Sequence, residues 1–151
     1  IEMKNNIFVN EMTSTYGKNY ALGLAYNGSF SNLNSDRNDF FTTTSPLAIA
    51  GGLNNTPSGN LTNLAAYQAL TGKDTNSKNA LPEFVSSTDL HLTTAAVNLI
   101  NLDGKGAPVS TTIDIDCDTR SVSNPDIGAD EIAGCDYPTI SSLSADVNPI
   151  P

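Results

Sequence analysis

The chain has 151 residues, which is enough for one domain with a sizeable core. Its 16 acidic and 7 basic residues give a formal net charge of −9, which argues against a nucleic-acid partner because phosphate binding requires clustered lysine and arginine. No apolar run approaches the roughly 18 residues that span a bilayer, so membrane insertion is not expected.

Small polar side chains without charge dominate the composition. The sequence holds 18 Asn, 16 Thr and 15 Ser, whereas charged residues make up only 15%. Such side chains bond to nearby backbone groups and favour turns over helix. With few helix-forming Glu, Lys, Arg and Met residues beside them, they are typical of an all-β protein.

Short strand candidates follow one another along the chain, separated by turn-forming residues. They span residues 7–9, 20–26, 39–41, 47–50, 89–92, 97–100 and 112–115. Many short strands at this spacing indicate a sandwich, a barrel or a solenoid. The first strand begins almost at once, so we expect that the chain is a cut from inside a larger polypeptide.

Two further patterns refine this prediction. Asn5-Asn6-Ile7-Phe8 and Asn38-Asp39-Phe40-Phe41 share the pattern N-[ND]-[IF]-F at an offset of 33 residues, which favours a solenoid, although a sandwich could show one such pair by chance. Residues 62–71 predict a short helix that decorates the β-scaffold, with Thr62 as its N-cap and Gly72 at its end.

Three sequence blocks occur in a distinctive order between residues 60 and 132. They read LAAYQALTGKDTNS, ALPEFVSSTDLHL and IDIDCDTRSVSNPDIGADE. This order resembles the terminal region of the bacterial right-handed parallel β-helix repeat family, related in fold to pectate lyases, which closes with D-x-D-G-x-x-R followed by D-[IV]-G-A-x-E. The chain departs from the family where Leu81-Pro82 replaces Asp-Pro, where residues 94–100 replace a G-S-P-A-I-[DN] block, and where Cys117 replaces the glycine of the closing motif.

The resemblance implies a fold and a location. The fold would be an all-β, right-handed parallel β-helix whose C-terminal coils and cap span residues 1–136, followed by a linker at residues 137–151 that leads to further domains of the same protein. Members of the family are usually secreted, often by Bacteroidota, and are carbohydrate-active enzymes or large surface adhesins. Arg120, Asp126, Asp130 and Glu131 would form the structural cap of the last coil.

The two cysteines are expected to pair on this solenoid. Cys117 and Cys135 lie 18 residues apart, close to one coil, so stacked coils would bring their Cα atoms within disulfide range. An exported chain with two cysteines fits such a bridge.

Alternating carboxylates at residues 114–118 are a candidate calcium site, and calcium is the one cofactor that the sequence suggests. Asp114, Asp116 and Asp118 share one face if the segment is a strand, and they could converge on one cation or face Arg120 and solvent. Structural ion pairing is favoured over calcium. Asp126, Asp130 or Glu131 folding back towards them would strengthen the calcium alternative.

No catalytic residues are predicted. His91 is the sole histidine and has no nucleophile elbow beside it, and one histidine with two distant cysteines makes zinc improbable. The basic residues that a lyase would need beside calcium are scattered, at Lys4, Lys18, Arg37, Lys73, Lys78, Lys105 and Arg120.

Three functions therefore remain as hypotheses. The leading one is a non-catalytic β-helix segment of a large secreted, cell-surface adhesin-like protein. The second is the C-terminal part of a polysaccharide lyase or glycoside hydrolase whose active site lies upstream. The third is a carbohydrate-binding module that would use Tyr20, Tyr26, Phe40 or Phe41 as stacking platforms, with a polysaccharide or cell-surface glycan as its partner.

Overall fold

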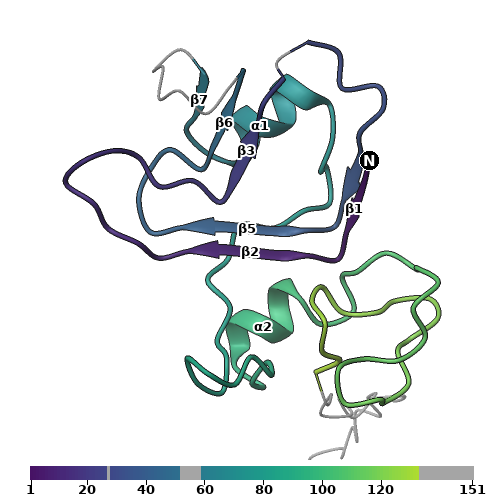
Figure 1. Cartoon of the computed structure of the whole chain (residues 1–151). Helices are drawn as coiled ribbons and strands as arrows, with labels where there is room; N and C mark the ends of the chain where they lie inside the picture. The colour runs from purple at the N-terminus through teal and green to yellow at the C-terminus, as the bar shows by residue number, and fades with distance from the viewer. Residues whose placement is uncertain (27, 52–58, 133–151) are drawn as a thin grey trace, which may run out of the picture.

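Two passes of the chain lie on one another in the N-terminal half of the molecule (Figure 1). The computed structural model describes residues 1–26, 28–51 and 59–132. The first layer holds β1 (Glu2–Lys4), β2 (Ile7–Asn10) and β3 (Leu22–Leu24), and the second layer holds β4 (Asn34–Asp36), β5 (Asp39–Thr42) and β6 (Ala48–Ala50). Each strand of the first layer pairs in parallel with its counterpart in the second layer.

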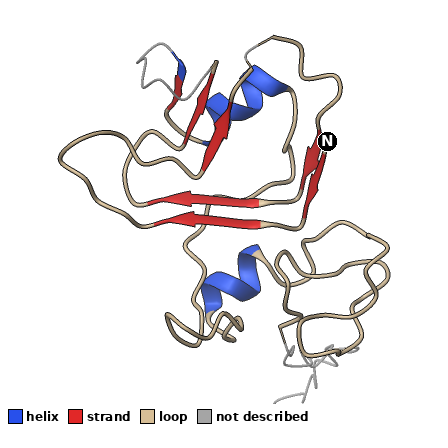
Figure 2. Cartoon of the chain, viewed as in Figure 1, coloured by secondary structure: helices blue, strands red, loops and turns tan. Residues whose placement is uncertain are grey.

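The remaining described residues add one strand, two helices and long loops. Strand β7 (Asn60–Leu61) pairs antiparallel with β6 and leads into helix α1 (Leu64–Thr71). A third pass, residues 73–80, returns past β5, where Asp39 and Lys78 form an isolated parallel bridge. Residues 81–132, which we call the C-terminal part, hold helix α2 (Ala96–Asn101) and lie beyond β2 in Figures 1 and 2. Neither helix has the length and hydropathy needed to cross a bilayer.

The prediction of a parallel β-helix is wrong. Named strands pair in parallel only between the first and second layers, the sheets contain two or three strands, and the last strand, β7, is antiparallel. Beyond Leu61, the described chain forms two helices, loops and isolated bridges, so no solenoid is closed (Figure 2). The predicted linker at residues 137–151 lies outside the described residues.

Buried side-chain hydrogen bonds explain why the later segments do not continue the sheets. Residues 97–100, predicted as a strand, belong to helix α2, in which Asn98 is fully buried. The Asn98 amide donates to the carbonyls of Glu83 at 2.7 Å and Thr93 at 2.9 Å, and its oxygen accepts from the Glu83 N–H at 3.0 Å. These bonds satisfy loop backbone groups that a β-ladder would otherwise have to pair.

The predicted helix is present, with a different N-cap. Helix α1 lies inside residues 62–71, but Asn63, not Thr62, caps it, by accepting a hydrogen bond from the Ala66 N–H at 2.9 Å. Gly72 ends the helix at φ 66°, a left-handed conformation that glycine adopts without a Cβ penalty.

The register of the sequence repeat differs from the prediction by one residue. Phe8 pairs with Phe40, at an offset of 32, and Ile7 pairs with Asp39. The rings of Phe8 and Phe40 stack with centroids 5.2 Å apart and planes 6° from parallel. This register keeps the two aromatic rings on the same, inward face of both layers.

The described residues form two apolar clusters, one inside the layers and one in the C-terminal part. The first consists of buried Phe40, Leu47, Ala48 and Tyr67, with side chains of the first layer packed against it. The second consists of buried Leu92, Leu102, Ile127 and Ile132, with Ile7 packed against it. Because side chains alternate along a strand, β2 contacts the first cluster through Phe8 and the second through Ile7.

A fully buried asparagine fastens three passes of the chain together. The Asn38 Oδ1 accepts from the backbone N–H of Asn6 at 3.0 Å, in the first pass. Its Nδ2 lies 3.0 Å from the Met3 carbonyl, also in the first pass, and 2.9 Å from the Asp74 carboxylate, in the third pass. The Asn38 backbone N–H donates to the Ser77 hydroxyl at 2.8 Å, so each pass is bonded to this one residue.

The neighbouring residue extends this attachment. Asp39 is fully buried, and its Oδ1 accepts from the Ala80 N–H at 2.9 Å, while the Lys78 N–H donates to the Asn38 carbonyl at 2.7 Å. Burial raises the pKa of Asp39 to about 6, while the hydrogen bond from the Ala80 N–H works in the opposite direction and lowers the pKa. The third pass is therefore held by polar groups of the second layer where no full strand ladder forms.

We expect Asn38→Ala to lower the free energy of unfolding by about 3 kcal/mol, because it leaves the Asn6 N–H and the Asp74 carboxylate buried without this partner. Urea unfolding measures the loss. The matched control is Asn32→Ala, because the Asn32 side chain is exposed and makes no hydrogen bond with the described residues; it should change stability by less than about 0.5 kcal/mol. Equal losses in the two variants would contradict the role of Asn38.

Candidate functional site

The acidic loop at residues 114–118 is organised by backbone hydrogen bonds to its first carboxylate. The Asp114 Oδ1 accepts from the N–H groups of Asp116 and Asp118, each at 2.9 Å, and its Oδ2 accepts from the Glu131 N–H at 3.2 Å. Burial pushes the pKa of Asp114 upward, but these three donors outweigh it and hold the pKa below its usual value. Asp114 is thus an ionised side chain that closes the loop.

Three carboxylates converge beside this loop. One oxygen each of Asp114, Asp116 and Asp130 lies within 4.8 Å of the others, whereas Asp118 does not belong to the group. Asp130 is buried, and its Oδ2 accepts from the Leu92 N–H at 2.7 Å. Calcium binds oxygens at about 2.3–2.6 Å, so one cation could contact all three carboxylates.

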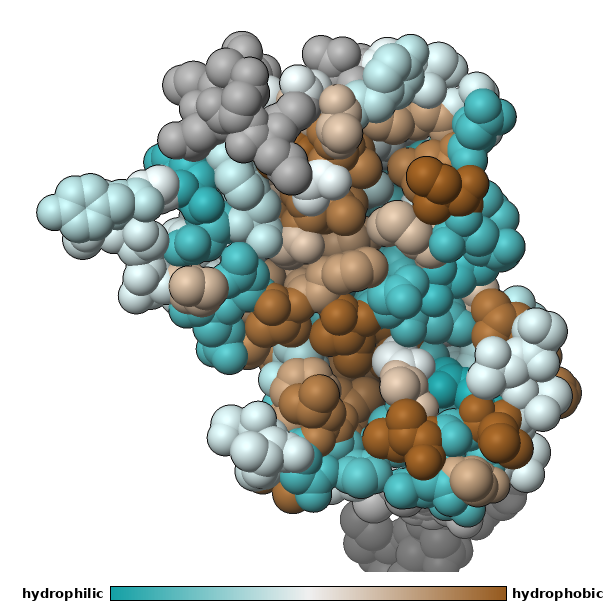
Figure 3. Space-filling view, viewed as in Figure 1, coloured by the Kyte–Doolittle hydropathy of each residue, from teal (hydrophilic) through white to brown (hydrophobic). Residues whose placement is uncertain are grey.

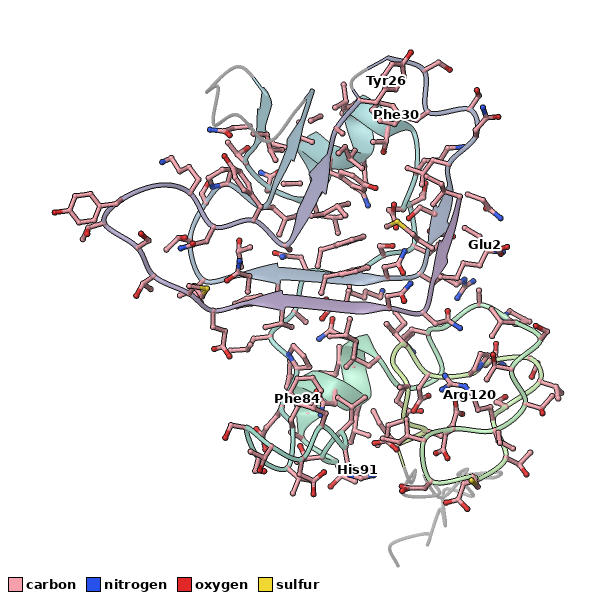
Figure 4. All side chains as sticks on the ribbon, viewed as in Figure 1. Glu2, Tyr26, Phe30, Phe84, His91 and Arg120 are labelled. Atoms are coloured by element: carbon pink, nitrogen blue, oxygen red, sulfur yellow. The ribbon has the colours of Figure 1, made fainter. Side chains whose placement is uncertain are left out.

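The histidine contacts one carboxylate of this group, that of Asp116. The His91 Nε2 lies 3.1 Å from Asp116, and its Nδ1 is hydrogen-bonded to Asp89. The bond to Asp89 first, and then the bond to Asp116, raise the pKa of His91 to about 9. At neutral pH His91 is therefore a cation that balances part of the negative charge, and Figure 4 shows it at the lower end of the C-terminal part.

The arginine of the predicted cap is buried within the C-terminal loops (Figure 4). Arg120 is 5% exposed and forms an ion pair with Glu131 at 3.0 Å. Its guanidinium also donates to the carbonyls of Asp126 at 2.8 Å and Gly128 at 3.1 Å. Arg120 therefore holds the turn at residues 126–131 from the inside.

Asp126 closes the same turn with both carboxylate oxygens. Its Oδ1 accepts from the Gly104 N–H and its Oδ2 from the Ile132 N–H, each at 2.6 Å. Burial raises the pKa of Asp126 to about 6, although both bonds favour the ionised form. The structure thus brings Arg120, Asp126 and Glu131 together, while Asp130 turns to the acidic loop.

The predicted disulfide lies partly outside the described residues. Cys117 is exposed, and its expected partner, Cys135, is not among the residues that the structure describes. Cys117 has φ 68°, in the left-handed region where a side chain is strained. Glycine, which has no Cβ, adopts this conformation without strain.

Most of the aromatic residues predicted as sugar-stacking platforms are buried or hydrogen-bonded within the fold. Phe40 is 1% exposed in the inner cluster, Phe41 is partly buried, and the Tyr20 hydroxyl donates to Asn60 at 2.8 Å. Tyr26 differs, because it is 62% exposed and lies edge-on to Phe30 with ring centroids 6.4 Å apart.

The residues of the three-pass attachment carry no motif of a functional site in the sequence. Asn38 stands at the start of the second repeat, and Asp74 and Ser77 lie within the first of the three sequence blocks. The repeated asparagine before an apolar strand was the available signal, since a buried asparagine needs several partners.

Comparison with known proteins adds no further assignment: no protein-family model, curated protein or solved structure matches the chain.

We expect His91 to titrate near pH 9, and NMR of the ring protons measures this midpoint. The raised pKa means that the ion pairs stabilise the fold fully below about pH 6.5 and that this contribution is lost as the pH rises through about 9. Asp89→Asn should lower the midpoint more than Asp116→Asn, because the hydrogen bond to Asp89 raises the pKa of His91 more than the bond to Asp116 does. A midpoint near 6.5 in the unaltered chain would refute the pairing.

With His91 protonated, we expect neither calcium nor a chelator to change the melting temperature at pH 7. The protonated imidazole already pairs with Asp116, and backbone N–H groups already donate to Asp114 and Asp130. Thermal unfolding with EDTA and with millimolar calcium tests this expectation. A calcium-dependent rise in melting temperature that Asp130→Asn removes would show instead that the three carboxylates bind the cation.

Proposed function

We propose that this chain is a non-catalytic, adhesin-like structural segment of a secreted or cell-surface protein. The observation that carries the proposal is that its chemically capable side chains are bonded to the chain's own loops. Asn38, Arg120 and Asp126 are buried and each bonds backbone groups of other segments. Groups held in this way position backbone and are poorly placed to exchange protons with a substrate.

The histidine supports the same proposal. His91 lies between Asp89 and Asp116, and its pKa of about 9 keeps it protonated at neutral pH. A general base works best when its pKa lies near the operating pH and its unprotonated nitrogen faces a substrate. Both nitrogens of His91 are hydrogen-bonded to carboxylates, so its arrangement favours an ion-pair role.

The proposed location rests on composition and on the motif resemblance. A net charge of −9 and a composition rich in Asn, Thr and Ser suit a soluble extracellular segment. The order of the three sequence blocks in residues 60–132 supports secretion and continuity with further domains of the same protein. Labelling of intact producing cells with an antibody against the chain should give a surface signal. A signal only after permeabilisation would contradict this location.

One partly exposed aromatic pair favours a second candidate function, glycan binding. Tyr26 and Phe30 come together at the top of the molecule in Figure 4, on the loop that follows β3. An exposed aromatic face can stack on the apolar face of a sugar ring. The pair is small and partly turned edge-on, so it suits one sugar unit.

A glycan array tests this second function. Binding that Tyr26→Ala abolishes would support it, with Tyr16→Ala as the matched control, since Tyr16 is 94% exposed and has no aromatic partner among the described residues. Silence across the array, or equal binding by both variants, would remove the glycan hypothesis. Release of unsaturated uronates or reducing ends from any polysaccharide would contradict the non-catalytic proposal.

A further inference from the structure

The inner apolar cluster is open on the side of the first layer. Apolar side chains of the first layer that pack on this cluster are only partly buried, and their register partners in the second layer are buried. The partly buried side chains are Met3, Phe8, Leu22 and Leu24, and their buried partners are Ser35, Phe40, Ala48 and Ala50. The outer face of the Phe8 ring thus lacks the stacking that Phe40 supplies on its inner face.

The same side carries an unpaired strand edge. Strand β2 pairs with β5 alone, and the N–H groups of Asp39 and Thr43 donate to the carbonyls of Asn6 and Asn10. Because backbone groups alternate in direction along a strand, Ile7 and Val9 direct their N–H and C=O groups away from β5. No other described residue forms a hydrogen bond with these groups.

A groove follows this edge. A hollow of about 780 Å³ is lined by every residue from Lys4 to Val9. Residues whose side chains point inward and residues whose side chains point outward both take part, as expected where the backbone edge of β2 forms one wall. Its opposite wall is apolar and comes from the C-terminal part, with Leu90, Val109, Ile113 and Ile115 each at least 40% exposed. A second hollow of about 670 Å³ continues past Asn10 to Met12. In Figure 3 hydrophobic residues gather at the level of β2 and on the loops beyond it.

We propose that this edge binds an extended strand of a separate, basic protein, which pairs with β2 and places an apolar side chain on Phe8. Only an extended backbone offers donors and acceptors in the alternation that Ile7 and Val9 leave unpaired. Apolar side chains of the added strand would fill the groove towards Ile113. This inference goes beyond the proposed function, because it assigns a protein partner to a surface that the structural role does not use.

The charges along the groove identify the partner as basic and argue against a second copy. Among the lining residues, Lys4 is paired with Glu2 at 2.7 Å and Arg120 with Glu131 at 3.0 Å, so their charges are balanced. Asp114 and Asp130 are among the residues that line the same groove, and Glu11 lines its continuation. A second copy would bring a net charge of −9 to this acidic edge.

The test uses the full chain and a capped synthetic peptide with lysine at both ends and valine, phenylalanine and valine at its centre. The control peptide has the same side chains but N-methylated backbone amides, which cannot donate to β2. Calorimetry should show binding of the first peptide and binding weaker by about tenfold or more for the second, because main-chain hydrogen bonds carry the recognition. Absence of binding, or equal binding of both peptides, would overturn the proposal.

Two variants locate the binding at the edge. Val9→Pro removes an outward N–H, and Ile113→Lys places a positive charge in the apolar wall, so each should weaken peptide binding by about tenfold. Val122→Lys, at a position 84% exposed outside the groove, should leave binding unchanged. If Val9→Pro fails to fold, Ile113→Lys decides alone. Self-association of the unaltered chain that either variant abolishes would assign the edge to a second copy and overturn the proposal.

Discussion

The fold depends on one buried amide that bonds three passes of the chain at once. The Asn38 side chain accepts a hydrogen bond from the Asn6 N–H in the first pass and donates one to the carboxylate of Asp74 in the third pass. A buried side chain with donors and acceptors on both sides fixes the vertical register of the passes, because any slip leaves polar groups without partners. Short strands of three or four residues could not set this register by themselves.

The C-terminal part is attached to the layers at the same corner. The Asn5 amide donates to the Ala107 carbonyl at 2.8 Å and its oxygen accepts from the Ala107 N–H at 2.6 Å, while Arg37 donates to the Lys105 carbonyl at 2.9 Å. Both Asn5 and Arg37 have positive φ, at 58° and 56°, at equivalent bends of the two layers. These bends thus direct polar side chains of both layers towards the loops of the C-terminal part.

Local features of the sequence predicted local structure, and long-range pairing decided the rest. The strands around Phe8 and Phe40 and the helix ending before Gly72 followed from apolar runs and turn residues. The solenoid did not, since its prediction assumed that later segments repeat the ladder, whereas Asn98 and Asp126 hold those segments as loops through side-chain bonds. The approach of His91 to Asp116 across 25 residues had no signal in the spacing of either.

Native-state hydrogen exchange tests most directly whether the three passes are one cooperative unit. The amides to follow are those of Asn6, Phe40 and Lys78, one from each pass. The Asn6 and Lys78 amides donate to Asn38, and the Phe40 amide donates to the Lys78 carbonyl. All three should exchange with a single free energy, equal to that of global unfolding, and respond together to urea. Exchange of the Lys78 amide at a much lower free energy than that of Phe40 would show that the third pass opens by itself and would contradict the account.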